Sequence, residues 1–132
     1  MPWMPRSPSL KLLALALLGL AAYNALGAIS GVTGYTFLRQ LPLDVPAAYL
    51  IAGHAAWAGL WAVLAWGLWR AQRWARWSVL AAAVAYLAHG WINRLVWGHS
   101  DYAVKTAPWS LAAGLLAVAL TAWLVGRSAP WR

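Results

Sequence analysis

The chain has 132 residues, of which 64% are hydrophobic and 9% are charged, and its mean hydropathy is +0.62. Because a water-soluble domain carries about a quarter charged residues, this composition predicts a protein that folds in a lipid bilayer. The sequence has no Cys, which excludes disulfides, thiolate ligands and Cys nucleophiles, and its net charge of +8 is spread between apolar runs, which argues against nucleic acid as a partner.

The first apolar run extends from Leu10 to Ile29, with the basic residues Arg6 and Lys11 at its start. It resembles a secretory signal peptide, with residues 25–27 (Ala-Leu-Gly) as a tolerable cleavage site. The run is longer than the apolar region of a signal peptide, so we expect a retained transmembrane helix over residues 10–29.

The second apolar run begins at Pro46 and continues to Trp69. Proline suits the first turn of a helix, and Asp44 complements the positive end of the helix dipole. At about 1.5 Å per residue, a helix over residues 46–69 exceeds a bilayer core of about 30 Å, so we expect it to be tilted.

The third run, residues 77–97, follows the second after a short connection, residues 70–76, which predicts a tight antiparallel hairpin. The fourth run covers residues 108–125. It begins at Pro108, and we expect Thr106 to cap its helix.

Four such helices predict an all-α fold, a polytopic membrane protein whose single membrane domain, residues 1–132, is an antiparallel four-transmembrane-helix bundle. Lys and Arg flanking short loops are retained in the cytoplasm. One side of the predicted topology holds Arg6, Lys11, Arg70, Arg73, Arg76, Arg127 and Arg132, and the other holds Arg39, Arg94 and Lys105. We therefore expect both termini in the cytoplasm (N-in/C-in) and the chain in a bacterial cytoplasmic (inner) membrane.

A few polar residues lie inside the predicted spans, where each is unfavourable unless it is paired, hydrated or bound. They are Asn24 in the first helix, His54 in the second, and His89, Asn93 and Arg94 in the third. Both histidines lie about 12 Å below the outer surface, so we expect these residues to form a polar cluster in the outer half of the bundle.

Helical spacing places Tyr86, His89, Asn93 and Trp97 on one stripe, and His54, Trp57 and Trp61 on another. If the stripes face each other, His54 and His89 are candidate axial ligands of haem or another tetrapyrrole. The alternative is that each histidine hydrogen-bonds a backbone carbonyl, Asn24 or Asn93, and so links one span to another.

Arg94 either extends to the headgroups or pairs with a lipid phosphate, a quinone-type oxygen or a partner's carboxylate. The only acids, Asp44 and Asp101, fall in the outer connections. Proton-coupled carriers use an intramembrane carboxylate, so we do not expect proton antiport. The small multidrug-resistance carriers have a similar length and four helices, but the carboxylate of their first helix has no counterpart here.

Residues 66–77 interleave Trp and Arg, a pattern that also suits single-stranded nucleic acid but here lies between two spans. We interpret these side chains as interface anchors that contact anionic headgroups: Trp66, Trp69, Arg70, Arg73, Trp74, Arg76 and Trp77. The turn resembles the Gly-Leu-Trp-Arg-x-x-Arg-Trp-Ala-Arg-Trp hairpins of small uncharacterised four-helix bacterial integral membrane proteins, with residues 86–95 as the companion stretch. That resemblance brings no activity with it.

Pairs of small residues have the spacing that permits close helix contact, and the sequence leaves open whether they face sister helices or another protein. They are Gly27 with Gly31, Ala55 with Gly59, and Ala113 with Ala117.

The sequence has no nucleophile motif and no metal-binding helix spacing, so we expect neither an enzyme nor a metal site, and we interpret residues 99–101 (His-Ser-Asp) as a turn. The leading hypothesis is a non-catalytic accessory or structural subunit of a larger membrane complex, with lipids, other membrane subunits or a second copy as partners. Two alternatives stay open. One is a tetrapyrrole-binding electron-transfer component that uses His54 and His89, and the other is a small transporter or lipid-handling protein with an outer polar cavity.

Overall fold

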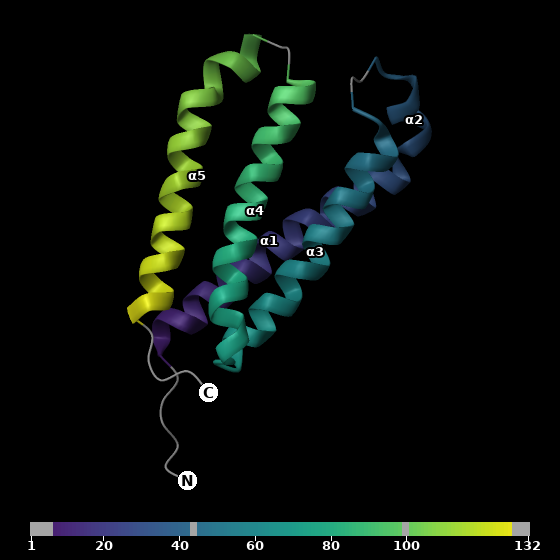
Figure 1. Ribbon diagram of the computed structural model, residues 1–132. Helices are drawn as coiled ribbons and strands as arrows, with labels where there is room; N and C mark the ends of the chain where they lie inside the picture. Colours follow the sequence, from purple (N-terminus) through teal and green to yellow (C-terminus); the bar gives the residue numbers. More distant parts are fainter. Residues whose placement is uncertain (1–6, 43–44, 99–100, 128–132) are drawn as a thin grey trace. The chain divides into compact units, whose positions relative to one another are not determined.

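The computed structural model describes residues 7–42, 45–98 and 101–127 (Figure 1). Within these ranges the chain forms helices and no strand. The helices are α1 (Pro8–Thr33), α2 (Tyr35–Gln40), α3 (Ala47–Trp69), α4 (Arg73–Trp97) and α5 (Asp101–Arg127). Some residues to which the sequence assigned a role lie outside the described residues, namely Arg6, Asp44, His99, Ser100 and Arg132.

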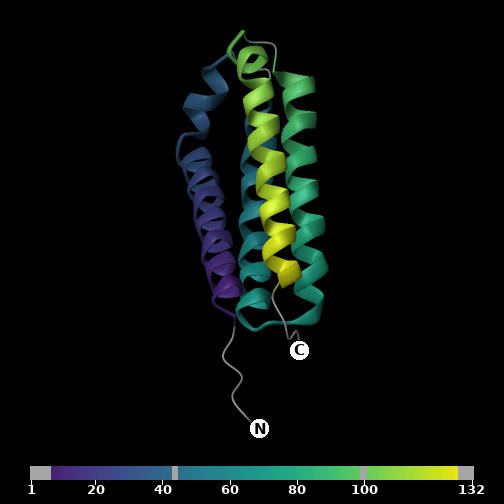
Figure 2. The same ribbon diagram turned by 90° about the vertical axis from the view of Figure 1, so that its left-hand side faces the viewer.

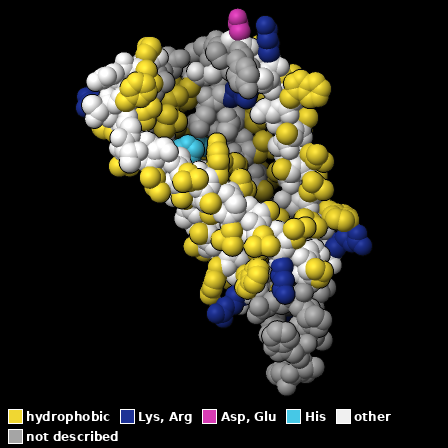
Figure 3. Space-filling view, turned by 180° about the vertical axis from the view of Figure 1, so that it is seen from behind, with side chains coloured by type: hydrophobic (Ala, Val, Ile, Leu, Met, Phe, Trp, Pro, Cys, Tyr) yellow, Lys and Arg dark blue, Asp and Glu magenta, His cyan; other side chains and the backbone are white. Residues whose placement is uncertain are grey.

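Four of these helices are long and apolar enough to cross a membrane: α1, α3, α4 and the part of α5 from Val104 to Arg127. The shortest, α3, has 23 residues, which at about 1.5 Å per residue is sufficient for a hydrocarbon core of about 30 Å. On the face shown in Figure 3, apolar side chains follow the helices, and Lys and Arg side chains lie near helix ends. The predicted all-α class with four membrane-length apolar helices is confirmed.

The chain divides into two compact units. One comprises residues 11–70, which include most of α1 with α2 and α3. The other comprises residues 1–10 and 71–132, which include α4 and α5. The predicted hairpin of α3 with α4, and the packing of all four spans into one bundle, involve both units and stay predictions.

In the first unit, α1 and α3 are antiparallel and approach closely at two glycines. A Cβ atom built on Gly27 would lie 2.8 Å from Nδ1 of His54, and one built on Gly31 would lie 2.5 Å from Cγ1 of Ile51. Glycine at these positions therefore makes room for side chains of α3. This pair of small residues faces a sister helix, whereas Gly59 of α3 has open space where its Cβ would be.

In the second unit, α4 and α5 lie side by side and antiparallel (Figures 1 and 2). Gly114 of α5 receives the end of the Leu87 side chain of α4, and a Cβ on this glycine would collide with it. Ala113 and Ala117, the pair chosen from the sequence, are exposed. The small residue of α5 that makes room for a side chain of α4 is therefore Gly114, one position after Ala113.

The start of α5 corrects the sequence interpretation. The helix begins at Asp101, so Thr106 lies inside it and the prediction that Thr106 caps the helix is wrong. Residues 101–107 include good helix formers, and the Asp101 carboxylate in the first turn complements the helix dipole. Pro108 therefore lies within the helix, which is bent near its N-terminal end in Figure 1, as expected where a backbone donor is missing.

The connections also differ from the predicted ones. The first helix continues to Thr33, and the short helix α2 occupies part of the segment predicted as a loop. Pro46 is the N-cap residue of α3, one position before its first turn. The connection between α3 and α4 is only residues 70–72, and within it Ala71 adopts φ 54°, a left-handed conformation that residues with a side chain rarely adopt.

Candidate functional site

The pair formed by Asn24 and His54 is the central polar feature of the first unit. Asn24 lies on α1 and is 1% exposed, and His54 lies on α3. The Asn24 side-chain amide donates from Nδ2 to the carbonyl oxygen of Leu20, 2.9 Å away. The amide oxygen of Asn24 lies 3.1 Å from Nδ1 of His54. Because a carbonyl oxygen can only accept, Nδ1 of His54 carries the proton and donates it.

This bond has a consequence for the other ring nitrogen of His54. In a neutral imidazole with the proton on Nδ1, Nε2 carries a lone pair and acts as an acceptor or a metal ligand. Among the residues that the structure describes, Nε2 has no hydrogen-bond partner. The Tyr23 ring meets the imidazole edge-on, with 6.3 Å between ring centres, and Gly27 leaves room beside it. Within the described part of the chain, the imidazole is thus held by one hydrogen bond, through Nδ1.

His89 and Asn93 are arranged differently. Both lie on α4, one turn apart, and Nδ2 of Asn93 is 3.4 Å from Nε2 of His89. This long contact has the amide donating to Nε2, so the nitrogen that is open in His54 is engaged in His89. The contact is within one helix and does not link two spans.

Arg94 links α4 to α5. Its Nη1 donates to the hydroxyl oxygen of Thr106 at 3.3 Å, and its guanidinium carbon lies 5.7 Å from the centre of the Trp91 ring. The sequence identified Arg94 but missed Thr106, which it treated as a helix cap. The signal that could have found this contact is Asp101, whose carboxylate suits the first turn of a helix that then includes Thr106.

The two predicted stripes lie on helices, one on α3 with His54 and one on α4 with His89. Trp57 and Trp61 stack on each other in α3, with ring centres 5.8 Å apart and planes 25° apart. His54 and His89 belong to different units, so their facing each other around a tetrapyrrole stays a prediction. A cavity shared by all five polar residues also stays a prediction. Among the described residues, no group of three His, Asp or Glu side chains is placed to hold a metal ion.

The predicted interface anchors lie at the ends of α3 and α4. Trp66, Trp69, Trp74 and Trp77 are between 41% and 67% exposed. Arg70 lies over the Trp66 ring at 5.2 Å and Arg76 over the Trp77 ring at 5.1 Å. Arg127 repeats this arrangement over Trp123 at the end of α5, at 4.7 Å. These cation–π pairs keep indole and guanidinium groups together at helix ends, which suits a membrane interface.

The polar side chains that stand out from the apolar sequence thus form separate interhelical and intrahelical contacts in the two units. No family model, no curated protein and no solved structure matches this chain.

Proposed function

We propose that this chain is a non-catalytic multi-pass membrane protein that serves as an accessory or structural subunit of a larger membrane complex. The observation that supports this role is the use of the intramembrane polar groups. Asn24 with His54 joins α1 to α3, and Arg94 with Thr106 joins α4 to α5. Polar groups used in this way hold helices together rather than act on a substrate.

The proposal includes orientation and location. The excess of Lys and Arg around the α3–α4 connection and near both termini favours a chain with both termini in the cytoplasm. The Trp and Arg anchors would contact anionic headgroups on that side. The membrane is then the cytoplasmic (inner) membrane of a bacterium.

The test is purification of the tagged chain from its native membrane in lipid nanodiscs formed directly by a copolymer. We expect one or a few membrane proteins in a fixed ratio to the chain, and we expect the same ratio when the tag is placed on the partner. Recovery of the chain in a single-copy state, at an abundance that does not depend on any co-purifying protein, would contradict the proposal. A defined homo-oligomer without other proteins would make it a self-assembling structural protein instead.

A second candidate is a component that binds haem or another tetrapyrrole through His54. One observation favours it: the Asn24 carbonyl receives the Nδ1 proton, which leaves the Nε2 lone pair open. Metal-ligating histidines generally donate their second ring nitrogen in this way. His54 fits the role of an axial ligand, whereas Nε2 of His89 is engaged by Asn93 in this conformation. A bound tetrapyrrole would supply one-electron transfer.

An absorption spectrum separates the two candidates. The protein purified from its native membrane is measured oxidised and dithionite-reduced. Cofactor binding predicts a Soret band that His54→Ala removes and that Asn24→Ala shifts or weakens, because the imidazole loses its orienting bond. A spectrum with only the Trp absorption, the same in all variants, would eliminate the cofactor candidate and leave the subunit role.

A further inference from the structure

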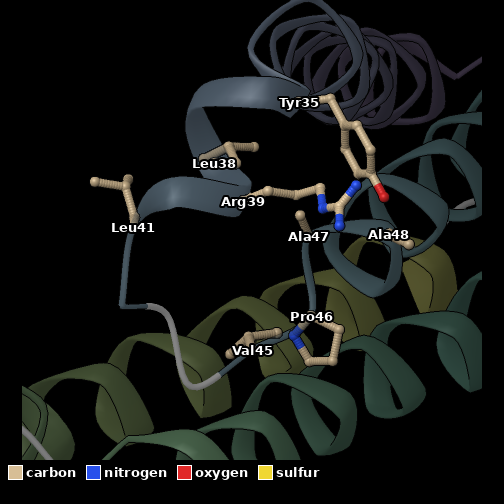
Figure 4. A pocket seen from close by; sticks show the side chains of 8 residues that line it. All are labelled: Tyr35, Leu38, Arg39, Leu41, Val45, Pro46, Ala47 and Ala48. Atoms are coloured by element: carbon tan, nitrogen blue, oxygen red, sulfur yellow. The ribbon is translucent and has the colours of Figure 1, made fainter.

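We propose that a pocket beside α2 binds the phosphate group of a membrane lipid through Arg39. The pocket lies within the unit of residues 11–70 and has a volume of about 300 Å³. Tyr35, Leu38 and Arg39 of α2 form one wall, and Val45, Pro46 and the first turn of α3 form the other (Figure 4). This site is distinct from the polar pair of Asn24 and His54, and it is independent of the subunit role.

The charge in this pocket comes from Arg39. Its side chain extends towards Tyr35 and the beginning of α3 in Figure 4, and its guanidinium carbon lies 5.8 Å from the centre of the Tyr35 ring. Among the described residues no carboxylate pairs with Arg39. A cation–π contact uses the face of the guanidinium and leaves N–H donors at its edge. These donors match the oxygens of a phosphate group.

The rest of the pocket favours a lipid over a free oxyanion. Leu38, Val45 and Pro46 line it with apolar surface, and Phe37, also on α2, is 64% exposed. Small-ligand pockets range from about 300 to 1,000 Å³, so this one has room for a headgroup and not for a whole lipid. Since α2 connects two membrane-length helices, it lies where a span meets the headgroups. The acyl chains would then follow the apolar surface outside the pocket.

The test is native mass spectrometry of the full chain, stripped of lipid in detergent and titrated with phosphatidylglycerol. We expect one tightly held lipid, and we expect Arg39→Gln to weaken its binding about tenfold or more, because a charge-assisted contact is lost. Ala47→Leu, which fills the pocket and leaves Arg39 in place, should weaken binding in the same direction. Arg127→Gln is the matched control, since it removes a guanidinium that also lies over an aromatic ring but is not among the residues that line this pocket.

The outcomes distinguish a specific lipid-binding site at Arg39 from non-specific attraction of an anionic lipid to any exposed basic residue. Equal losses in Arg39→Gln and Arg127→Gln, or wild-type binding by Ala47→Leu, would overturn the proposal, provided that circular dichroism shows all variants folded. Displacement of the lipid by inorganic phosphate at comparable concentration would also overturn it, because the site would then be specific for free oxyanion. Asp44→Asn should leave lipid binding unchanged or tighter. A loss as large as that of Arg39→Gln would mean that the site requires a carboxylate, and would count against a phosphate ligand.

Discussion

The amide of Asn24 determines which nitrogen of His54 carries the proton. With Nδ2 donated to Leu20 and the carbonyl oxygen facing the imidazole, only the Nδ1–H tautomer completes the bond. The pair therefore has two effects: it joins α1 to α3 by a hydrogen bond, and it fixes the direction of the Nε2 lone pair.

The energy of this bond is measurable by a double-mutant cycle. We expect Asn24→Leu and His54→Leu each to lower the free energy of unfolding, and the coupling between them to be about 0.6–1.7 kcal/mol, the range for hydrogen bonds between membrane helices. Reversible unfolding in mixed micelles measures it. Strict additivity of the two single changes would mean that the side chains do not interact.

Gly27 permits this bond, because a methyl group there would lie 2.8 Å from the imidazole nitrogen. We expect Gly27→Ala to destabilise the protein by about 1–3 kcal/mol, measured by the same unfolding assay, since the imidazole must move. Gly59→Ala is the control and should be neutral or slightly stabilising, because nothing lies within 4 Å. Adding His54→Ala to Gly27→Ala should remove most of the loss. If the loss persists unchanged, the clash is not with His54.

Residue identity could be predicted from the sequence better than residue pairing. Asn24, His54 and Arg94 stand out because polar groups are rare in apolar runs. Their partners depend on the rotation of each helix about its axis and on side-chain rotamers. Helical spacing alone does not fix either quantity between two helices. The link from Arg94 to Thr106 was missed for this reason, and also because Thr106 was placed outside its helix.

The membrane-length helices could be predicted from the sequence because the hydropathy and length of a segment do not depend on its contacts with other segments. The ends were less predictable. Pro108 favours a helix start, but here the helix begins at Asp101, whose carboxylate complements the helix dipole. In the same way, the Gly-containing segment after residue 30 continues as helix to Thr33 and forms α2.

Replacement of Pro108 distinguishes the two possible starts of α5. If Pro108 lies inside the helix, Pro108→Ala restores a backbone hydrogen bond to Val104 and should raise stability by up to about 3 kcal/mol. Amide exchange of residues 105–107 should slow at the same time. If the helix began at Pro108, these amides would exchange rapidly in both proteins and the substitution would have little effect. Ala112→Gly, in the exposed interior of α5, should shift stability the opposite way by about 1 kcal/mol.

For the whole molecule, the sequence predicted the helical class and the number of membrane-length helices, because hydropathy and length determine both. The packing of all four spans against one another could not be predicted in this way, since it depends on contacts between residues far apart in the chain. Orientation depends on charge distribution relative to a membrane, and its test needs a membrane.

The absence of Cys makes that test direct, because each introduced thiol is the only one in the protein. We expect Ser7→Cys and Arg73→Cys to react with an impermeant maleimide only in inside-out vesicles. Gln40→Cys and Lys105→Cys should react in intact cells. The reverse pattern would invert the proposed topology, and equal labelling of all four from both sides would mean dual insertion.

The division of the chain at Ala71 has a consequence for biosynthesis. Residues 11–70 contain both partners of the Asn24–His54 bond, and residues 71–127 contain both partners of the Arg94–Thr106 bond. The first helical hairpin can therefore satisfy its buried amide while the second is still in the ribosomal tunnel. If the chain is inserted as it is synthesised, we expect the two hairpins to enter the bilayer one after the other, with the Asn24–His54 bond formed before the second hairpin follows.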